Sequence, residues 1–358
     1  MSHLSPLEKI NLGSFYTPPF LVHKAFAMLT AHLQPKGYCL LDSACGAGAF
    51  LTQEGFKRVI GVDRDLTALK QAKINAPSAH LIHTNALRGC SRQILGLAKS
   101  DKLAIVGNPP YNDTTSQVRQ SLKTAPIDTD PLLKARDLGL SFLRSYDLLK
   151  ADFVCVLHPL SYLIKKTNFQ ALKGFRQNYR LKDACILSSK IFCPKSLAPF
   201  PIILALYARD KQGMDFSFIA NFSFNTLEGK SFRLKDLEPI TPHIDKYPNA
   251  KKVQEAQVFF YPLRDINALA RSKTFMPTQK AHSVLVSPQK YSLYCYIDIF
   301  KTQIPHIPYY LRNCDIFFNF ESFKALENDF IEASQNKQVS PKIKKYFRDL
   351  LGEHYVAN

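Results

Sequence analysis

The stretch YCLLDSACGAGAF, residues 38–50, decides the fold. Its apolar run ends at Asp42, and small residues follow directly. A turn of small residues after a buried strand is where a doubly wound α/β fold binds a nucleotide-like ligand. Gly46 and Gly48 tolerate positive φ angles and let a ligand approach the backbone closely. We therefore expect a strand that ends at Asp42, a ligand-binding turn, and a helical segment at 49–55.

The same alternation of strand-like and helix-like segments continues along the chain. It is typical of a parallel sheet covered by helices, so we predict an α/β fold class. The later runs 184–189 and 200–208 are expected to form a hairpin that closes one edge of the sheet. The further strands are expected at 58–63, 80–84, 102–108 and 153–158, and the helices at 19–33, 65–74 and 131–149.

The composition changes near residues 209–215, RDKQGMD, where the chain becomes polar and the alternation stops. We place a domain boundary there, which gives a first domain at 1–211 and a smaller one at 212–358. The second part is rich in aromatic residues and interrupted by prolines. Its two terminal helices are expected at 322–334 and 341–351.

The charge of the chain predicts a partner that carries phosphate. Forty-seven Lys and Arg stand against 29 Asp and Glu, a net charge of +18. The densest basic run, 165–195, contains Asp183 as its only acid, although a solvated helix face would explain it too. The eight cysteines form no CxxC pair, and no export signal or membrane-spanning apolar run is evident. These features favour a cytoplasmic protein with no membrane contact.

Two acidic residues indicate which ligand the small-residue turn binds. Asp63 ends the second expected strand, where its carboxylate can accept both hydroxyls of a ribose. The turn lacks the G-x-G-x-x-G pattern of dinucleotide sites, because position 51 is leucine. Asp42 directly before the turn would repel a pyrophosphate but suits the cationic methionine end of S-adenosylmethionine. Asp42 could instead cap the following helix, a role that Ser43 could also fill.

The fourth expected strand runs into Asn108-Pro109-Pro110-Tyr111. The prolines keep nearby carbonyl groups out of a helix, so these remain acceptors. An aromatic amine could donate one hydrogen to the Asn108 side chain and the other to the Pro109 carbonyl, while Tyr111 stacks on its ring. Transfer from a sulfonium requires no metal and no covalent intermediate. The alternative is an ordinary turn, since Asn-Pro and Pro-Pro both punctuate loops.

Taken together, these residues resemble the amino-group DNA methyltransferases of bacterial restriction–modification systems, particularly the adenine-N6 enzymes, over residues 13–208. The resemblance implies a Rossmann-like S-adenosylmethionine-dependent methyltransferase sheet, with 212–358 as a target-recognition domain. It implies that the target base is flipped out of double-stranded DNA, with a cognate restriction endonuclease as a further partner. The implied cofactor-binding residues are Tyr16, Thr17 and Pro18 of an F-Y-T-P motif, then Asp42, Ala44, Cys45, Gly46, Gly48, Asp63 and Asn108; the implied catalytic residues are Asn108, Pro109, Pro110 and Tyr111.

Two further assignments follow from the same resemblance. Phe192, after Lys190 and Ile191, corresponds to the aromatic residue that stacks on the flipped base together with Tyr111, although it could equally be a core residue. The family often uses an aspartate after the third strand to read the adenine of the cofactor. This chain has Asn85 there, whose side-chain oxygen can still accept a hydrogen bond.

Other readings of the motifs remain open. An RNA adenine or guanine amino-methyltransferase shares the catalytic logic, although the F-Y-T-P segment argues against it. A cytosine-N4 DNA methyltransferase needs the same geometry, but such motifs more often begin with serine. A protein-glutamine methyltransferase and a catalytically silent nucleic-acid-binding subunit are poorly supported.

Overall fold

The computed structural model describes residues 17–111, 128–194, 199–248, 258–263, 265–280 and 282–357. The chain divides into two compact units. The first contains 1–195, 202–220 and 224–227, and the second contains 196–201, 221–223 and 228–358. The domain boundary after residue 211 stays a prediction. No helix of the described residues is long and apolar enough to cross a membrane.

One sheet forms the centre of the first unit, and its strands follow the order β3-β2-β1-β4-β5-β7-β6-β8. Neighbouring strands from β3 to β5 are parallel, β7 runs antiparallel to β5, and β6 pairs with β8 in parallel. This arrangement confirms the predicted α/β fold. The strands are β1 (Tyr38–Asp42), β2 (Arg58–Asp63), β3 (His80–His83), β4 (Lys102–Gly107), β5 (Phe153–Pro159), β6 (Tyr179–Ser188), β7 (Pro201–Arg209) and β8 (Phe224–Thr226).

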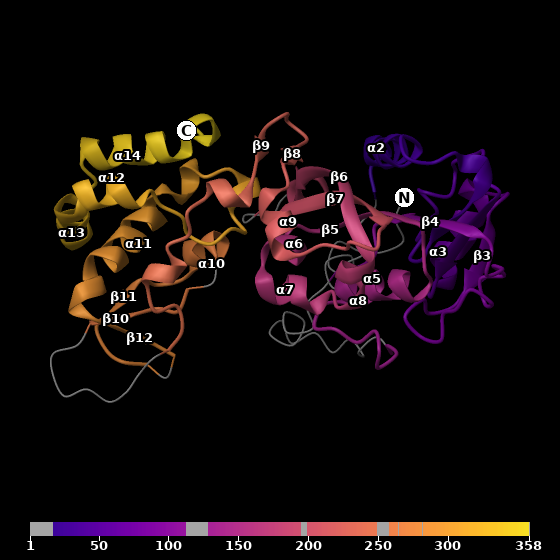
Figure 1. Cartoon of the computed structure of the whole chain (residues 1–358), viewed down its shortest axis with the longest axis horizontal. Coiled ribbons are helices and arrows are strands. Elements are labelled where there is room, and N and C mark those ends of the chain that lie inside the picture. Colours follow the sequence, from indigo (N-terminus) through magenta and orange to yellow (C-terminus); the bar gives the residue numbers. More distant parts are fainter. Residues whose placement is uncertain are drawn as a thin grey trace. The chain divides into compact units, whose positions relative to one another are not determined.

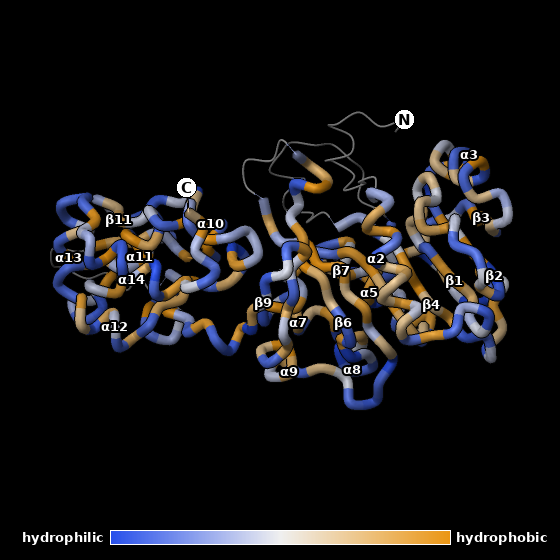
Figure 2. Tube along the Cα trace, turned by 90° about the horizontal axis from the view of Figure 1, so that it is seen from above, coloured by the Kyte–Doolittle hydropathy of each residue, from blue (hydrophilic) through white to orange (hydrophobic). Residues whose placement is uncertain are grey.

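Helices cover both faces of this sheet. In Figure 1, α2 lies over one face and α5, α7 and α8 lie over the other. The central strands are buried on both sides, as parallel strands usually are, and hydrophobic residues concentrate along them in Figure 2. The helices of the unit are α2 (Pro19–Thr30), α3 (Leu66–Asn75), α5 (Leu138–Leu148), α6 (Ser161–Ile164), α7 (Lys166–Ala171), α8 (Gly174–Asn178) and α9 (Phe216–Asn221), with 3-10 turns at Pro35–Gly37 and Ser189–Ile191.

Three details differ from the sequence-based expectation. Residues 49–55 form turns rather than a helix, because Gly48 and Gly55 adopt positive φ and the bonds nearby span three residues. The helix expected over 131–149 begins only at Leu138, where the Asp137 side chain caps it. The strands β6 and β7 are neighbours as expected, but they do not close the sheet, because β8 pairs with β6.

The second unit is built around helix α11 (Tyr291–Gln303), whose Tyr296 is fully buried among aromatic rings. A small antiparallel sheet joins β11 (Phe275–Met276), β10 (Val258–Phe260) and β12 (Val284–Val286). The expected helix at 322–334 is divided at Leu326. The remaining elements are β9 (Ser231–Phe232), α10 (Ile266–Arg271), α12 (Phe320–Ala325), α13 (Glu327–Asn336) and α14 (Pro341–Leu351), with 3-10 turns at Leu234–Asp236, Thr241–His243, Pro288–Lys290, Ile304–His306, Tyr309–Leu311 and Gly352–His354.

Candidate active site

The carboxyl ends of three neighbouring strands bring together the polar residues singled out in the sequence. Asp42 is the last residue of β1, Asp63 is the last residue of β2, and Asn108 follows the end of β4. Since β2, β1 and β4 are adjacent and parallel, these three side chains belong to one edge of the sheet. Ligands of open α/β sheets bind outside this edge.

The turn after β1 is tied to the end of β2 by hydrogen bonds. The Cys45 N–H donates to the Val62 carbonyl at 2.9 Å, and the Gly46 N–H donates to Asp63 Oδ2 at 2.8 Å. Asp63 Oδ1 accepts from the Asp65 N–H at 2.9 Å. The carboxylate therefore orients two backbone segments and keeps further lone pairs for a ligand.

The two glycines of this turn have different surroundings. Gly46, at φ +50°, has open space where a side chain would begin. At Gly48, at φ +82°, a Cβ would lie 3.2 Å from the Cβ of Ala72 on α3. Gly46 is thus the position where a ligand could approach the backbone, whereas Gly48 allows close packing of a helix. The Cys45 side chain is buried in an apolar cluster, so only its backbone is available to a ligand.

Asp42 is 2% exposed and reaches toward β4. A Cβ at position 107 would lie 2.7 Å from Asp42 Oδ1, so the glycine there leaves room for the carboxyl group directly before the Asn108–Tyr111 motif. Asp42 Oδ1 accepts from the Ala44 N–H at 3.2 Å. Burial raises the pKa of Asp42 to about 8; the Ala44 hydrogen bond opposes this and the charge of Asp63 adds to it.

The alternative role of Asp42 or Ser43 as a helix cap does not apply, because turns rather than a helix follow. The Ser43 hydroxyl instead bonds the hydroxyl of Tyr146, a buried residue of α5, at 3.0 Å. Sequence reasoning missed Tyr146, since nothing in its local pattern distinguishes it from other apolar-facing residues of this helix.

A hydrogen bond joins the Asn-Pro-Pro-Tyr motif to the F-Y-T-P segment. The Asn108 side-chain amide donates to Thr17 Oγ1 at 3.2 Å, and Thr17 is 5% exposed. Pro18 follows as the residue that precedes α2. Tyr16 lies outside the described residues. Two motifs separated by 91 positions therefore meet at the same edge of the sheet.

Tyr111 is the last residue of the Asn-Pro-Pro-Tyr motif and is 6% exposed. Burial raises the pKa of Tyr111 well above its usual value, and the neighbouring Cys193 and Asp137 raise it further. Pro109 is buried and Pro110 half-buried. Tyr111 therefore presents little surface to a base in this conformation of the chain.

Phe192 lies in the loop between β6 and β7 and is half-buried. The Asp210 N–H donates to the Asn178 carbonyl, which pairs the end of β7 with the start of β6. Because β7 runs antiparallel to β5, this loop lies at the same edge as Asn108. The neighbouring residue Cys193 affects the pKa of Tyr111, which also places this loop near the Asn108–Tyr111 motif. Phe192 is thus at the expected edge of the sheet.

Asn85 uses its side chain to organise the loop after β3. Its Oδ1 accepts from the Leu87 N–H at 3.0 Å, and its amide donates to the Asp128 carbonyl at 2.6 Å. These bonds account for one acceptor position and one donor of the side chain. Asn85 could contact a cofactor only through the second lone pair of its Oδ1 and the second hydrogen of its amide.

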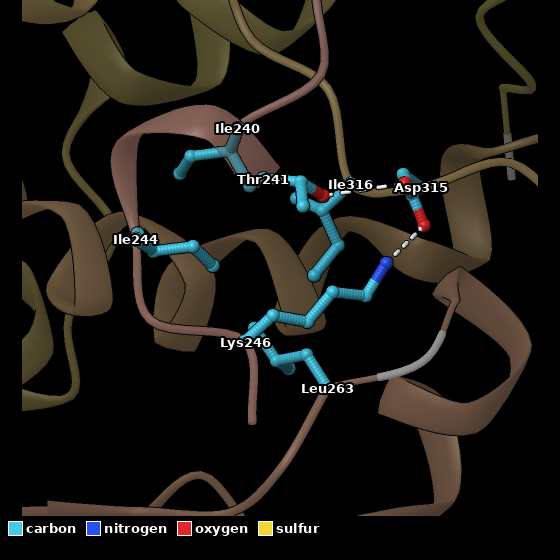
Figure 3. Close-up of a pocket in the computed structure, with 7 residues that line it drawn as sticks. All are labelled: Ile240, Thr241, Ile244, Lys246, Leu263, Asp315 and Ile316. Atoms are coloured by element: carbon cyan, nitrogen blue, oxygen red, sulfur yellow. Dashed lines mark hydrogen bonds and ion pairs between the residues drawn. The ribbon is translucent and has the colours of Figure 1, made fainter. Parts of the chain in front are cut away.

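A hollow in the second unit, drawn in Figure 3, is lined by apolar side chains and a small polar group. Lys246 forms an ion pair with Asp315 at 2.7 Å, and Thr241 donates to the same carboxylate at 3.2 Å. These polar groups bind one another, so the hollow offers little to a ligand. Among the described residues, no three His, Cys, Asp or Glu side chains are placed to hold a metal ion.

No protein-family model and no curated protein matches this chain. Several solved structures share its architecture. A modification subunit of a type I restriction enzyme, so described, from Vibrio vulnificus has a TM-score of 0.43 and 17% identity over 60% of this chain. The match covers 47% of that subunit, so this chain spans about half of its length.

Two other structures illustrate the range of the similarity. A protein from Listeria monocytogenes described as a class I S-adenosylmethionine-dependent methyltransferase has a TM-score of 0.43 and 15% identity, over 62% of this chain and 67% of that one. A protein from Pyrococcus horikoshii described as an RNA methyltransferase has a TM-score of 0.41 and 13% identity, over 58% and 93%. The strand order and the helices on both faces of the sheet give the first unit of this chain a doubly wound α/β fold. At these identities and TM-scores, the similarities do not identify a reaction or a substrate.

Proposed function

We propose that this chain is an S-adenosylmethionine-dependent methyltransferase that methylates the exocyclic N6 amine of adenine in DNA. One observation carries the proposal: the Asp42 carboxyl packs against Gly107, the residue directly before Asn108, at the edge of the sheet that also holds Asp63. A methyl donor held by the acids would therefore lie next to an amide that can hold an amine.

The residues at this edge fit the cofactor. Gly46 leaves open space beside its backbone, and the adjacent Asp63 carboxylate is suited to ribose hydroxyls. Asp42 would face the cationic methionine end, with Thr17 and Pro18 nearby as its cover. The bound cofactor supplies an electrophilic methyl group on a sulfonium. A positive charge beside Asp42 would also favour the ionised form of this buried acid.

The catalytic motif supplies acceptors rather than a strong base. The Asn108 side-chain oxygen and the Pro109 carbonyl would accept the two hydrogens of the adenine amine. Both bonds leave more electron density on the nitrogen, which makes its lone pair a better nucleophile. Tyr111 and Phe192 are proposed to hold the flipped base from its two faces. Because Tyr111 is buried, base entry would require its surroundings to move.

Charge supports a nucleic-acid substrate, since the chain carries +18. We propose double-stranded DNA as the partner, 1–211 as the catalytic domain, 212–358 as the target-recognition domain, a cognate restriction endonuclease as a further partner, and the cytoplasm as the location. The basic run 165–195 does not act as one surface. Arg180 donates to the Gly213 carbonyl at 3.0 Å and Lys182 pairs with Asp210 at 3.0 Å, both at the edge opposite Asn108.

The test is to incubate the protein with methyl-labelled S-adenosylmethionine and with DNA or RNA from an unmethylated strain, followed by nucleoside analysis. We expect label in N6-methyladenine from DNA. Label confined to RNA, or to N4-methylcytosine, would replace the proposed substrate with one of the alternatives. The absence of label from both nucleic acids would contradict the proposal. Asn108→Ala serves as the inactive control.

A further inference from the structure

A partly buried hydrogen bond lies next to the Asn108–Tyr111 motif. The side chain of Asp137, which caps α5, accepts from the Gly139 N–H at 2.9 Å and from the hydroxyl of Tyr162. Tyr162 belongs to α6, the short helix after β5, and is 1% exposed. The bond thus joins two elements that follow β4 and β5 at the edge of the sheet that carries Asn108.

Gly139 brings this bond into contact with Tyr111. A Cβ at position 139 would lie 2.5 Å from the Tyr162 hydroxyl and 3.0 Å from the Cβ of Tyr111. Only a backbone without a side chain therefore separates the two tyrosines. The influence of Asp137 on the pKa of Tyr111 agrees with this proximity. A movement of the Asp137–Tyr162 pair would be passed directly to Tyr111, because packed groups have no space to absorb it.

Tyr162 is itself fixed from the other side. Its ring stacks on His158 at a centroid distance of 5.2 Å and an interplanar angle of 10°. His158 is 1% exposed and bonds the Tyr207 hydroxyl through Nε2 at 2.7 Å. Burial lowers the pKa of His158 to about 4, so the stack stays neutral at physiological pH. The Tyr162 hydroxyl therefore projects from a rigid support.

We infer that Asp137 and Tyr162 are positioning residues for methyl transfer, which act through Gly139 to set the place of Tyr111 and hence of the target base. This inference rests on the proposed function. A stacking residue must lie within a fraction of an ångström of its place for an amine to be aligned with a methyl group. Neither residue is proposed to touch the cofactor or the base.

The experiment compares four variants in steady-state methylation of unmethylated genomic DNA. Tyr162→Phe removes the hydroxyl but keeps the stack on His158, and Asp137→Ala removes the acceptor. Asp137→Asn keeps an oxygen for both donors. Tyr179→Phe is the matched control, because this buried tyrosine donates to the Ala151 carbonyl at 2.7 Å at the opposite edge of the sheet.

We expect Tyr162→Phe and Asp137→Ala to lower kcat about tenfold while KM for S-adenosylmethionine stays within about twofold. Asp137→Asn should restore most of kcat, and Tyr179→Phe should leave it near wild type. The thermal midpoints of Tyr162→Phe and Tyr179→Phe should agree. A purely structural role would lower kcat in both tyrosine variants in proportion to their loss of stability.

Equal kcat for wild type and Tyr162→Phe would overturn the inference and leave the proposed function intact. Failure of Asp137→Asn to restore kcat would also overturn it, since the oxygen acceptor would then not be the relevant feature. If the wild-type protein methylates no DNA in this assay, the proposed function and the inference fall together.

Discussion

The two halves of the candidate site differ in the chemistry of their side chains. At the ends of β1 and β2 the side chains are acids, Asp42 and Asp63, one of them almost fully buried. After β4 and in the loop between β6 and β7 the groups are a neutral amide, carbonyls and aromatic rings, including Asn108, Tyr111 and Phe192. A cationic donor suits the first half and a neutral, planar amine suits the second. The division predicts that binding of the cofactor and transfer of the methyl group can be impaired separately.

The largest expected effects are opposite changes in two variants: one should lose kcat and keep its cofactor affinity, and the other should lose cofactor affinity. Asn108→Ala should reduce kcat by about a thousandfold or more, because the amine loses the side-chain acceptor that aligns it, while the Kd for S-adenosylmethionine stays near wild type. Asp63→Ala should instead weaken that Kd by about ten- to a hundredfold, the typical worth of a hydrogen bond to a charged group. Calorimetry and single-turnover kinetics measure the two effects.

Thermal unfolding of both variants is the control for misfolding. It is needed because Asp63 also accepts a hydrogen bond from the Gly46 N–H, which Asp63→Ala removes. A variant that changes Kd and kcat by the same factor would contradict the division into two halves. Unchanged cofactor affinity in Asp63→Ala would remove Asp63 from the proposed site.

An intermediate effect should appear in the pH dependence of cofactor affinity. The pKa of Asp42 is raised to about 8 by burial, so the acid is largely protonated at neutral pH. Since a cation beside it favours the ionised form, affinity for S-adenosylmethionine should increase by about tenfold from about pH 6.5 to about pH 8 and level off above about pH 9. Asp42→Asn should flatten this rise, which calorimetry at each pH would detect. An equal rise in the variant would contradict the role of Asp42.

The same group has the opposite effect on stability. With a pKa raised above its unfolded value, Asp42 makes the folded chain less stable as pH rises from about 4 to about 8, because only the unfolded form releases the proton easily. Asp42→Asn should therefore unfold at a higher temperature than wild type at pH 8, with a smaller difference at pH 5.

The smallest effect concerns the contact with phosphate. Lys134, before α5, and Lys190, after β6, are exposed at the edge that carries Asn108. Replacing both with glutamine should lower the slope of log affinity against log salt by about 1.8 for nonspecific duplex, about 0.9 for each lost contact. The matched control replaces the exposed Lys36 and Lys211, at the opposite edge, with glutamine. Equal slopes for the two double variants would show that this edge of the sheet does not face the phosphate backbone of the DNA.

The sequence predicted the central strands of the sheet well because each of them is a short apolar run with a clear local pattern, whereas β8 and the first half of β6 were not predicted. The runs at 58–63 and 102–108 match β2 and β4 closely, and the acid that ends β2 was placed at the correct edge. The prediction of a helix at 49–55 was wrong, because the positive φ angles of Gly48 and Gly55 outweighed the helix-forming residues between them. Propensity summed over a window does not register a single left-handed residue.

The residues behind the site could not be predicted, because their contacts join distant parts of the chain. Asp137 and Tyr162 are 25 positions apart, and Ser43 and Tyr146 are 103 apart. The partners of individual residues in the basic run 165–195 could not be predicted for the same reason. Arg180 lies 4.0 Å from the ring centre of Phe218, a partner that only the folded chain supplies.

Gly107 couples the turn that begins at Asp42 to the motif that begins at Asn108, because it lies between them. A methyl group at this position would compete with the Asp42 carboxyl for the same space, and that carboxyl is too deeply enclosed to retreat. If the proposed function holds, a single substitution at position 107 would impair both the binding of the cofactor and the alignment of the amine.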